Sequence, residues 1–195
     1  MTRKALPAYR PFATLALPSN KASLALGIGF IAALAGAAIG APAMALTGSL
    51  LAFSLSWGAM VDLDRFILPD VLTLGLVVAG VVIAVSDGLL AAQPYLIGAA
   101  AGYFSLAAVA GIYRRLRGRN GLGMGDAKLL AAAGAWLGWM ALPFVLLIAS
   151  LACLVLLGCQ AILRRQPIQS SAIPFGPYLA GAIWIVWLAL LGGRA

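Results

Sequence analysis

The sequence has no glutamate and no histidine, and aspartates are its only acidic residues, five in 195. Charged residues make up 9% of the chain and hydrophobic residues 64%, with a mean hydropathy of +1.05. Soluble domains carry roughly a quarter charged residues, so this composition excludes a soluble globular protein. The chain is an integral membrane protein by composition, and any acid–base chemistry must rest on its few aspartates.

Cysteine is also scarce, with Cys153 and Cys159 lying six residues apart in one apolar segment. This spacing matches no metal site, so neither a zinc site nor a disulfide framework is expected, and both residues are expected to be small core residues. The net charge of +8 does not indicate nucleic-acid binding, because the basic residues do not gather on a soluble face. We interpret them as topology signals.

What the sequence has in abundance is apolar segments long enough for membrane helices. Since a spanning helix needs about 20 apolar residues, the chain has room for roughly six or seven, which predicts an all-α, polytopic membrane helix bundle. The segments run over 24–41, 44–61, 71–86, 92–113, 127–138, 140–163 and 178–192. Residues 1–22 are interpreted as a basic cytoplasmic tail and 23–193 as the membrane domain.

Two of these segments have a second interpretation. The segment 24–41 follows basic residues and is followed by GAPAMA, so it resembles a cleavable secretory signal as well as a permanent anchor. The segment 127–138 is short, so we expect it to cross only part of the bilayer or to meet the next segment at a broken turn.

Charge places the loops on the two sides of the membrane. If the N-terminal tail is cytoplasmic and seven segments span, every lysine and arginine except Arg194 falls on the cytoplasmic side, as the positive-inside rule expects. The same threading puts every aspartate except Asp87 on that side. Asp87, among turn residues, is interpreted as an ordinary loop residue.

Asp62 and Asp64 follow the apolar run SLSWGAMV at the end of a predicted helix. The helix dipole disfavours an anion at that end, so capping does not explain Asp62, and acids within membrane segments usually mark function. If the helix continues, Asp64 lies about 200° around it from Asp62, so both cannot face one point. The residues alone do not decide between them. Asp70, after a proline, either caps the next helix or shapes the site.

Asp126 lies in GLGMGDAKL, where it either caps the following helix or serves in catalysis. Gly121, Gly123 and Gly125 leave the backbone free of side chains and able to adopt positive φ, which would let an extended peptide approach the carboxylate. On this hypothesis, Gly125→Val should impair catalysis.

Two carboxylates from separate helices on one membrane face suggest a catalytic pair. When two carboxyls share a site they hold one proton between them. The ionised one can then activate water against a peptide carbonyl while the protonated one donates a proton. Lys128 and Arg65 either bias the local field or extend their charges to the interface.

Three motifs, VDLDRFILPD at 61–70, GLGMGDAKLLAAAGAWLGW at 121–139 and IPFGPYLA at 173–180, resemble those of type IV prepilin peptidases, the GxGD membrane aspartyl proteases. The resemblance covers the chain from about residue 24 onward. It implies removal of basic leaders from prepilins or pseudopilins at the cytoplasmic face of the inner membrane. It makes Asp62 and Asp126 the catalytic pair, with Asp64, Asp70, Gly123, Gly125 and Lys128 as supporting residues.

The sequence departs from longer members of that family in one respect. They carry a cytoplasmic domain with two CxxC pairs, and many also methylate the new N-terminus; this chain has neither the domain nor those cysteines in its sequence. The expectation is therefore a peptidase without metal, cofactor or methyltransferase activity, with the lipid bilayer and a prepilin as its partners. The alternatives are a small proton-coupled transporter or channel that uses intramembrane aspartates and a non-catalytic assembly factor with the same fold.

Overall fold

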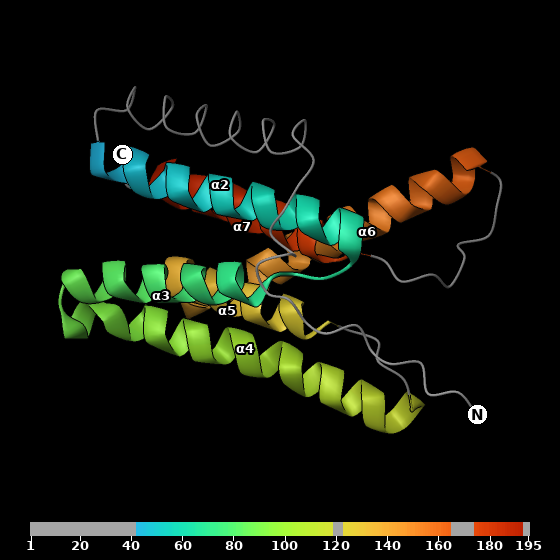
Figure 1. Cartoon of the computed structure of the whole chain (residues 1–195), viewed down its shortest axis with the longest axis horizontal. Helices are drawn as coiled ribbons and strands as arrows, with labels where there is room; N and C mark the ends of the chain where they lie inside the picture. The colour runs from blue at the N-terminus through green and yellow to red at the C-terminus, as the bar shows by residue number, and fades with distance from the viewer. Residues whose placement is uncertain (1–41, 119–122, 165–173, 193–195) are drawn as a thin grey trace.

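The computed structural model describes residues 42–118, 123–164 and 174–192, and these ranges form α-helices joined by short connections (Figure 1). The predicted segments from 44 onward are confirmed as helices, and the segment 24–41 lies outside the described residues. The elements are α2 (Pro42–Arg65), α3 (Asp70–Ser86), α4 (Leu89–Arg117), α5 (Met124–Leu137), the 3-10 turn η1 (Trp139–Ala141), α6 (Leu142–Arg164) and α7 (Gly176–Gly192).

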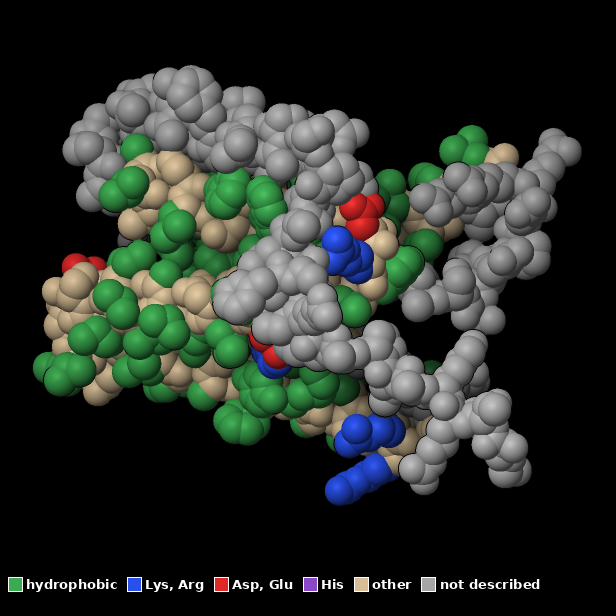
Figure 2. Space-filling view, in the orientation of Figure 1, with side chains coloured by type: hydrophobic (Ala, Val, Ile, Leu, Met, Phe, Trp, Pro, Cys, Tyr) green, Lys and Arg blue, Asp and Glu red, His purple; other side chains and the backbone are tan. Residues whose placement is uncertain are grey.

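The surface of this bundle is suited to lipid. Three stretches are long and apolar enough to cross a membrane, Ala45–Arg65, Leu89–Arg117 and Trp139–Cys159, and α3 and α7 are shorter apolar helices. Large hydrophobic side chains such as Phe104 and Phe144 are more than half exposed. On the face seen in Figure 2, hydrophobic side chains are spread along the helices, whereas the basic side chains lie in the middle and at the lower right. The expected all-α membrane bundle is confirmed.

The central element is α5. It packs against α3, α4, α6 and α7, and ten of its 14 residues are buried. Alanine, glycine and leucine make up most of α5, and these small or flexible residues let neighbouring helices approach on every side. A 14-residue helix is about 21 Å long, shorter than a bilayer core of about 30 Å. Gly138, with φ of 81°, ends α5 and leads into η1, so the expected broken turn is confirmed.

Glycines set the contact between α4 and α5. A Cβ on Gly134 of α5 would overlap the carbonyl of Gly98 in α4, and a Cβ on Gly102 would overlap the carbonyl of Leu130. The two backbones therefore touch directly along one face. On the other side of α5, the Trp136 indole Nε1 donates a hydrogen bond to the Leu76 carbonyl of α3 at 2.8 Å.

The cysteines of α6 differ from expectation. Both are free thiols, Cys153 is half-buried and Cys159 is exposed, so neither lies in the core. The apolar sequence around them misled the prediction, because a lipid-facing helix surface is as apolar as a protein core.

Candidate active site

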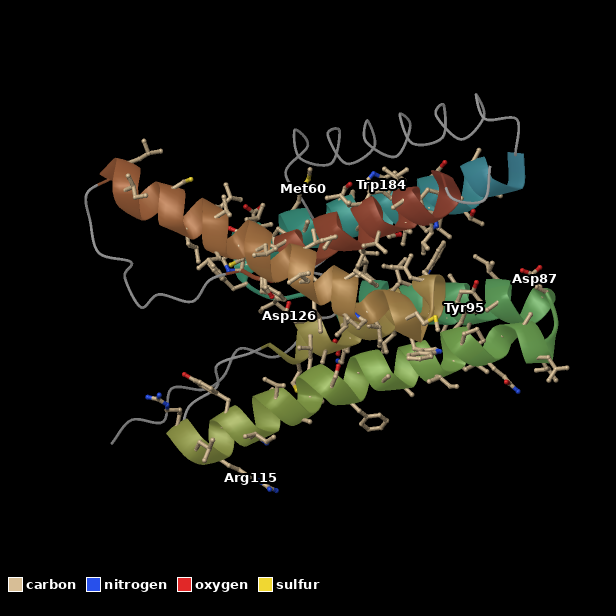
Figure 3. All side chains as sticks on the ribbon, turned by 180° about the vertical axis from the view of Figure 1, so that it is seen from behind. Met60, Asp87, Tyr95, Arg115, Asp126 and Trp184 are labelled. Carbon is tan, nitrogen blue, oxygen red and sulfur yellow. The ribbon has the colours of Figure 1, made fainter. Side chains whose placement is uncertain are left out.

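One end of each of four helices contributes to the candidate site. α2 ends there at Arg65, and α3, α5 and α7 begin there with Asp70, Met124 and Gly176. The short connection from α2 to α3 carries Leu68, which is 6% exposed and lies against the starts of both α5 and α7. The position of Leu68 places three helix N-termini around the end of α2. Asp87, in contrast, lies at the α3–α4 turn, far from Asp126 along the bundle (Figure 3).

Asp62 and Asp64 lie on opposite sides of α2. The helix continues through both residues to Arg65, with the Phe66 N–H donating to the Asp62 carbonyl at 2.8 Å. Asp62 is 5% exposed and packed inside the protein, whereas Asp64 is exposed. Of the two acids at the end of α2, only Asp62 therefore reaches the interior.

The buried carboxylate of Asp62 has a backbone partner. The amide of Gly176, the first residue of α7, donates to Asp62 Oδ2 at 3.1 Å in a buried setting. The first N–H groups of a helix have no partner within it, and they form the positive end of the helix dipole. The N-terminus of α7 thus offsets the unfavourable position of Asp62 near the C-terminal end of α2.

Gly176 was not among the predicted site residues, although it lies within IPFGPYLA. A Cβ at this position would be 2.6 Å from Asp62 Oδ2 and 2.7 Å from Leu68 Cδ1, so only glycine fits. The signal in the sequence was a glycine between two bulky motif residues, Phe175 and Pro177, at a helix start. Its partner, 114 residues away, was not deducible from that pattern.

Asp126 lies in the first turn of α5, outside the membrane-spanning helices, and is 7% exposed. Its predicted alternative role as an N-cap is wrong, because Gly123 is the N-cap and α5 begins two residues before Asp126. Burial and, after it, the charge on Asp62 raise the pKa of Asp126 to about 6, while a hydrogen bond from the Gly123 backbone acts in the opposite direction. The two carboxyl groups therefore interact electrostatically.

The described glycines before Asp126 do not adopt the positive φ considered for them, and one of them has a packing role. Gly123 has a φ of −74° and Gly125 is helical, so neither adopts positive φ, and Gly121 lies outside the described residues. A Cβ on Gly125 would lie 2.9 Å from the Leu68 Cβ. Gly125 thus allows α5 to begin close against the α2–α3 connection, which brings Asp126 toward Asp62.

Asp70 and Lys128 connect the two predicted motifs directly. Lys128 Nζ lies 2.5 Å from Asp70 Oδ1, with 23% of the lysine side chain and 42% of the aspartate side chain exposed. Pro69 is the N-cap of α3, without a side-chain capping bond, so Asp70 is an ion-pair partner rather than the cap. This pair joins the start of α3 to the first turns of α5.

Comparison with known proteins identifies the group to which this arrangement belongs. The sequence profile of the type IV leader peptidase family matches residues 49–158, which is more than half of the chain. The chain belongs to the type IV leader peptidase family.

Individual relatives agree with the family profile. The chain is 46% identical over 145 residues to a prepilin leader peptidase/N-methyltransferase of Aeromonas hydrophila, which covers 72% of this chain and 50% of the relative. A protein of the same name from Aeromonas salmonicida (strain A449) is 46% identical over 75% of this chain and 52% of its own length. One from Dickeya chrysanthemi is 43% identical over 78% of this chain and 54% of its own length. The chain spans about half the length of these curated relatives. No solved structure matches it.

Most of the candidate site residues lie within the range that the family profile matches. Asp62, Asp70, Asp126 and Lys128 all lie within residues 49–158, whereas Gly176 lies beyond them. The contact from Gly176 to Asp62 is therefore a feature that the structure adds to the family match.

An apolar groove of about 270 Å³ flanks Asp62 between α2 and α7. Its lining includes Met60 and Leu63 of α2 and Pro177 and Trp184 of α7; Met60 and Trp184 are labelled in Figure 3. Leu63 and Pro177 are the chain neighbours of Asp62 and Gly176, but Asp62 itself is not among the residues that line the groove. The Asp62 carboxyl contacts the start of α7 through the Gly176 amide.

The side chains of the site are suited to proton transfer. Across the described ranges, no three or more of the usual metal-ligating side chains come together. The groups that this family member brings together are two carboxyls, one backbone amide and one peripheral ion pair. Carboxyls placed in this way can both donate and accept protons.

Proposed function

We propose that this protein is a membrane-embedded aspartic endopeptidase that removes the basic leader from prepilins or pseudopilins. In this proposal Asp62 and Asp126 activate water and protonate the substrate, with no serine or cysteine nucleophile. Asp64, Asp70, Gly123, Gly125 and Lys128 support the site rather than react. Family membership favours this function over the transporter that intramembrane aspartates would also fit.

The observation that carries the proposal is the pair of buried carboxyls, one from α2 and one from α5, in a member of a leader peptidase family. Two interacting carboxyls that share a proton supply a general base and a general acid at once. Peptide hydrolysis needs both, because water must lose a proton and the leaving amine must gain one.

The substrate assignment rests on the relatives. They are named prepilin leader peptidase/N-methyltransferase, and the chain aligns with about half of each. We extend the leader peptidase activity to this chain because the family match contains Asp62 and Asp126. The absence of methyltransferase activity stays a prediction.

The location assigned is the inner membrane, with the reaction at its cytoplasmic face. The supporting observation is charge: Arg114, Arg115 and Arg117 stand in the last turn of α4, which precedes the motif of Asp126. Basic residues concentrate on the cytoplasmic side of membrane proteins.

Co-expression with a prepilin tests the function. We expect leader cleavage by the wild-type protein and its loss in Asp62→Ala and in Asp126→Ala, with Asp87→Ala as a matched control that still cleaves. Mass spectrometry of the product N-terminus reports cleavage site and methylation together, and we expect an unmethylated product. Processing that persists in both single variants, at normal levels of inserted protein, would exclude the pair as catalytic.

A further inference from the structure

The two aspartates of the site differ in what surrounds them, and this difference bears on their roles. The following inference rests on the proposed function. Asp62 Oδ2 accepts a buried hydrogen bond from the Gly176 amide at the start of α7. A donor of this kind stabilises a carboxylate over a neutral carboxylic acid, and the positive end of the α7 dipole acts in the same direction.

Asp126 shares with Asp62 its burial and a backbone hydrogen bond, here from Gly123, but it differs in the balance of these effects. It is buried in the first turn of α5 and lies within reach of the Asp62 charge. Burial and, after it, the Asp62 charge favour its neutral form; they outweigh the hydrogen bond from the Gly123 backbone and raise the pKa of Asp126 to about 6. In the state with one proton on the pair, that proton therefore belongs on Asp126.

We propose that Asp62 is the ionised general base, that Asp126 is the protonated general acid, and that the Gly176 amide fixes this division of roles. Gly176 is a positioning residue, since it acts through Asp62. Its lack of a side chain is required, because a Cβ would lie 2.6 Å from Asp62 Oδ2.

With these roles, peptide hydrolysis proceeds in two steps, the addition of water and the loss of the amine. As water attacks the scissile carbonyl carbon, its proton passes to Asp62 and the Asp126 proton passes to the carbonyl oxygen, which gives a neutral gem-diol. When the C–N bond breaks, Asp62 gives its proton to the leaving amine and Asp126 takes one from a gem-diol hydroxyl. The product carboxylic acid leaves, and the pair returns to its starting protonation state.

Other charged groups near the pair do not account for the same division. The titratable side chains on the adjoining helix ends are Asp64, Arg65, Asp70, Lys128 and Tyr178. Asp70 and Lys128 pair with each other, and Asp64 and Arg65 are both exposed. The arginines of α4 lie further off, with Arg115 well away from Asp126 in Figure 3. The charge that acts on Asp126 is that of Asp62.

Replacing the Gly176 amide by an ester tests the proposal without adding any side-chain atom. Glycolic acid at position 176, introduced by suppressor tRNA in cell-free translation into nanodiscs, removes only the N–H donor. The control is glycolic acid at Gly75 of α3, a helix glycine around which even an added Cβ would meet nothing within 4 Å. The pH profile of leader cleavage is then measured for both esters and for the wild type.

The two limbs of the pH profile distinguish the roles. If Asp62 is the base, removing the Gly176 N–H destabilises its carboxylate. The acidic limb of the profile then moves to higher pH by about one to two units, and the alkaline limb stays in place. Movement of the alkaline limb alone would reverse the assignment, because it would mean that Asp62 carries the proton in the active state. Two unmoved limbs would show that the Gly176 amide does not set the roles.

Infrared spectroscopy gives a second measurement that needs neither the ester nor a substrate. At a pH of about 5 the exposed aspartates are largely ionised, so a protonated carboxyl band reports the pair. We expect this band in the wild type and in Asp62→Asn and its loss in Asp126→Asn; the reverse pattern would overturn the proposal. If the wild type cleaves no leader, the proposed function fails, while the infrared result still decides which aspartate holds the proton.

Discussion

The Asp70–Lys128 ion pair should couple the start of α3 to α5. Neutralising either residue tests whether this coupling stabilises the protein. The pair joins the first residue of α3 to α5 across 58 residues of sequence. We predict that Asp70→Asn and Lys128→Met each weaken the protein modestly, and that the double variant is no worse than the more affected single one.

The magnitude follows from geometry and exposure. Solvent-exposed ion pairs contribute about 0.2–1 kcal/mol, because water screens the charges and ordering the side chains opposes the attraction. Lys128 is only 23% exposed, which favours the upper end of that range, although the 42% exposure of Asp70 keeps the pair within it. A coupling of about 1 kcal/mol corresponds to a change of about fivefold in an equilibrium or rate constant.

Two assays read this coupling. Unfolding in detergent, followed by tryptophan fluorescence, gives the free energies for a double-mutant cycle, and leader cleavage gives the rates. Asp70→Asn also removes a favourable charge from the first turn of α3. This effect is the same with and without Lys128, so it cancels in the double-mutant cycle, which then reports the energy of the ion pair alone. Asp87→Asn, at the other end of α3, is the matched control and should change neither quantity. Fully additive losses from the two single variants would refute the reasoning.

Three further predictions concern packing and protonation. Gly134→Ala should lower the free energy of unfolding by about 1–3 kcal/mol, because its Cβ meets the Gly98 backbone, whereas Gly111→Ala, with open space around it, should raise it by up to about 1 kcal/mol. Leu68→Ala should lower unfolding free energy by about 2–5 kcal/mol and reduce leader cleavage, since this buried side chain lies against the starts of α5 and α7. The folded state holds a proton on Asp126 up to a pH of about 6, against an ordinary pKa of 3.8, so unfolding free energy should fall as pH rises through that interval. Asp126→Asn should flatten that slope in unfolding measurements across the same pH range.

The helices were predictable because each is encoded locally. Apolar runs of membrane length and the charge of the loops predicted the described helices to within a few residues at most ends. In the motif around Asp126, the start of α5 was predicted too late: Met124 and Gly125 are already helical, so that Asp126 lies within the first turn. Glycines near a helix start make its first residue hard to predict, because glycine is found in loops, at helix caps and at close helix contacts.

The contacts that build the site were not predictable in the same way. The Gly176–Asp62 hydrogen bond and the Asp70–Lys128 pair join residues 114 and 58 positions apart, and nothing local to either partner reports the other. Burial separates Asp62 from Asp64, which residue physics could not do, since burial depends on which face of α2 meets α7. Gly125 shows the same limit: its absent side chain makes room for Leu68, a neighbour known only from the fold.

The most direct test of the central claim is the rate of leader removal by purified protein in nanodiscs, measured for the wild type, Asp62→Asn, Asp126→Asn and Asp87→Asn. These substitutions keep side-chain size nearly constant while removing the ability of a carboxyl to exchange protons. The account predicts cleavage by the wild type and Asp87→Asn and none by the other two, with all four equally folded. Cleavage at the wild-type rate by either Asp62→Asn or Asp126→Asn would contradict it.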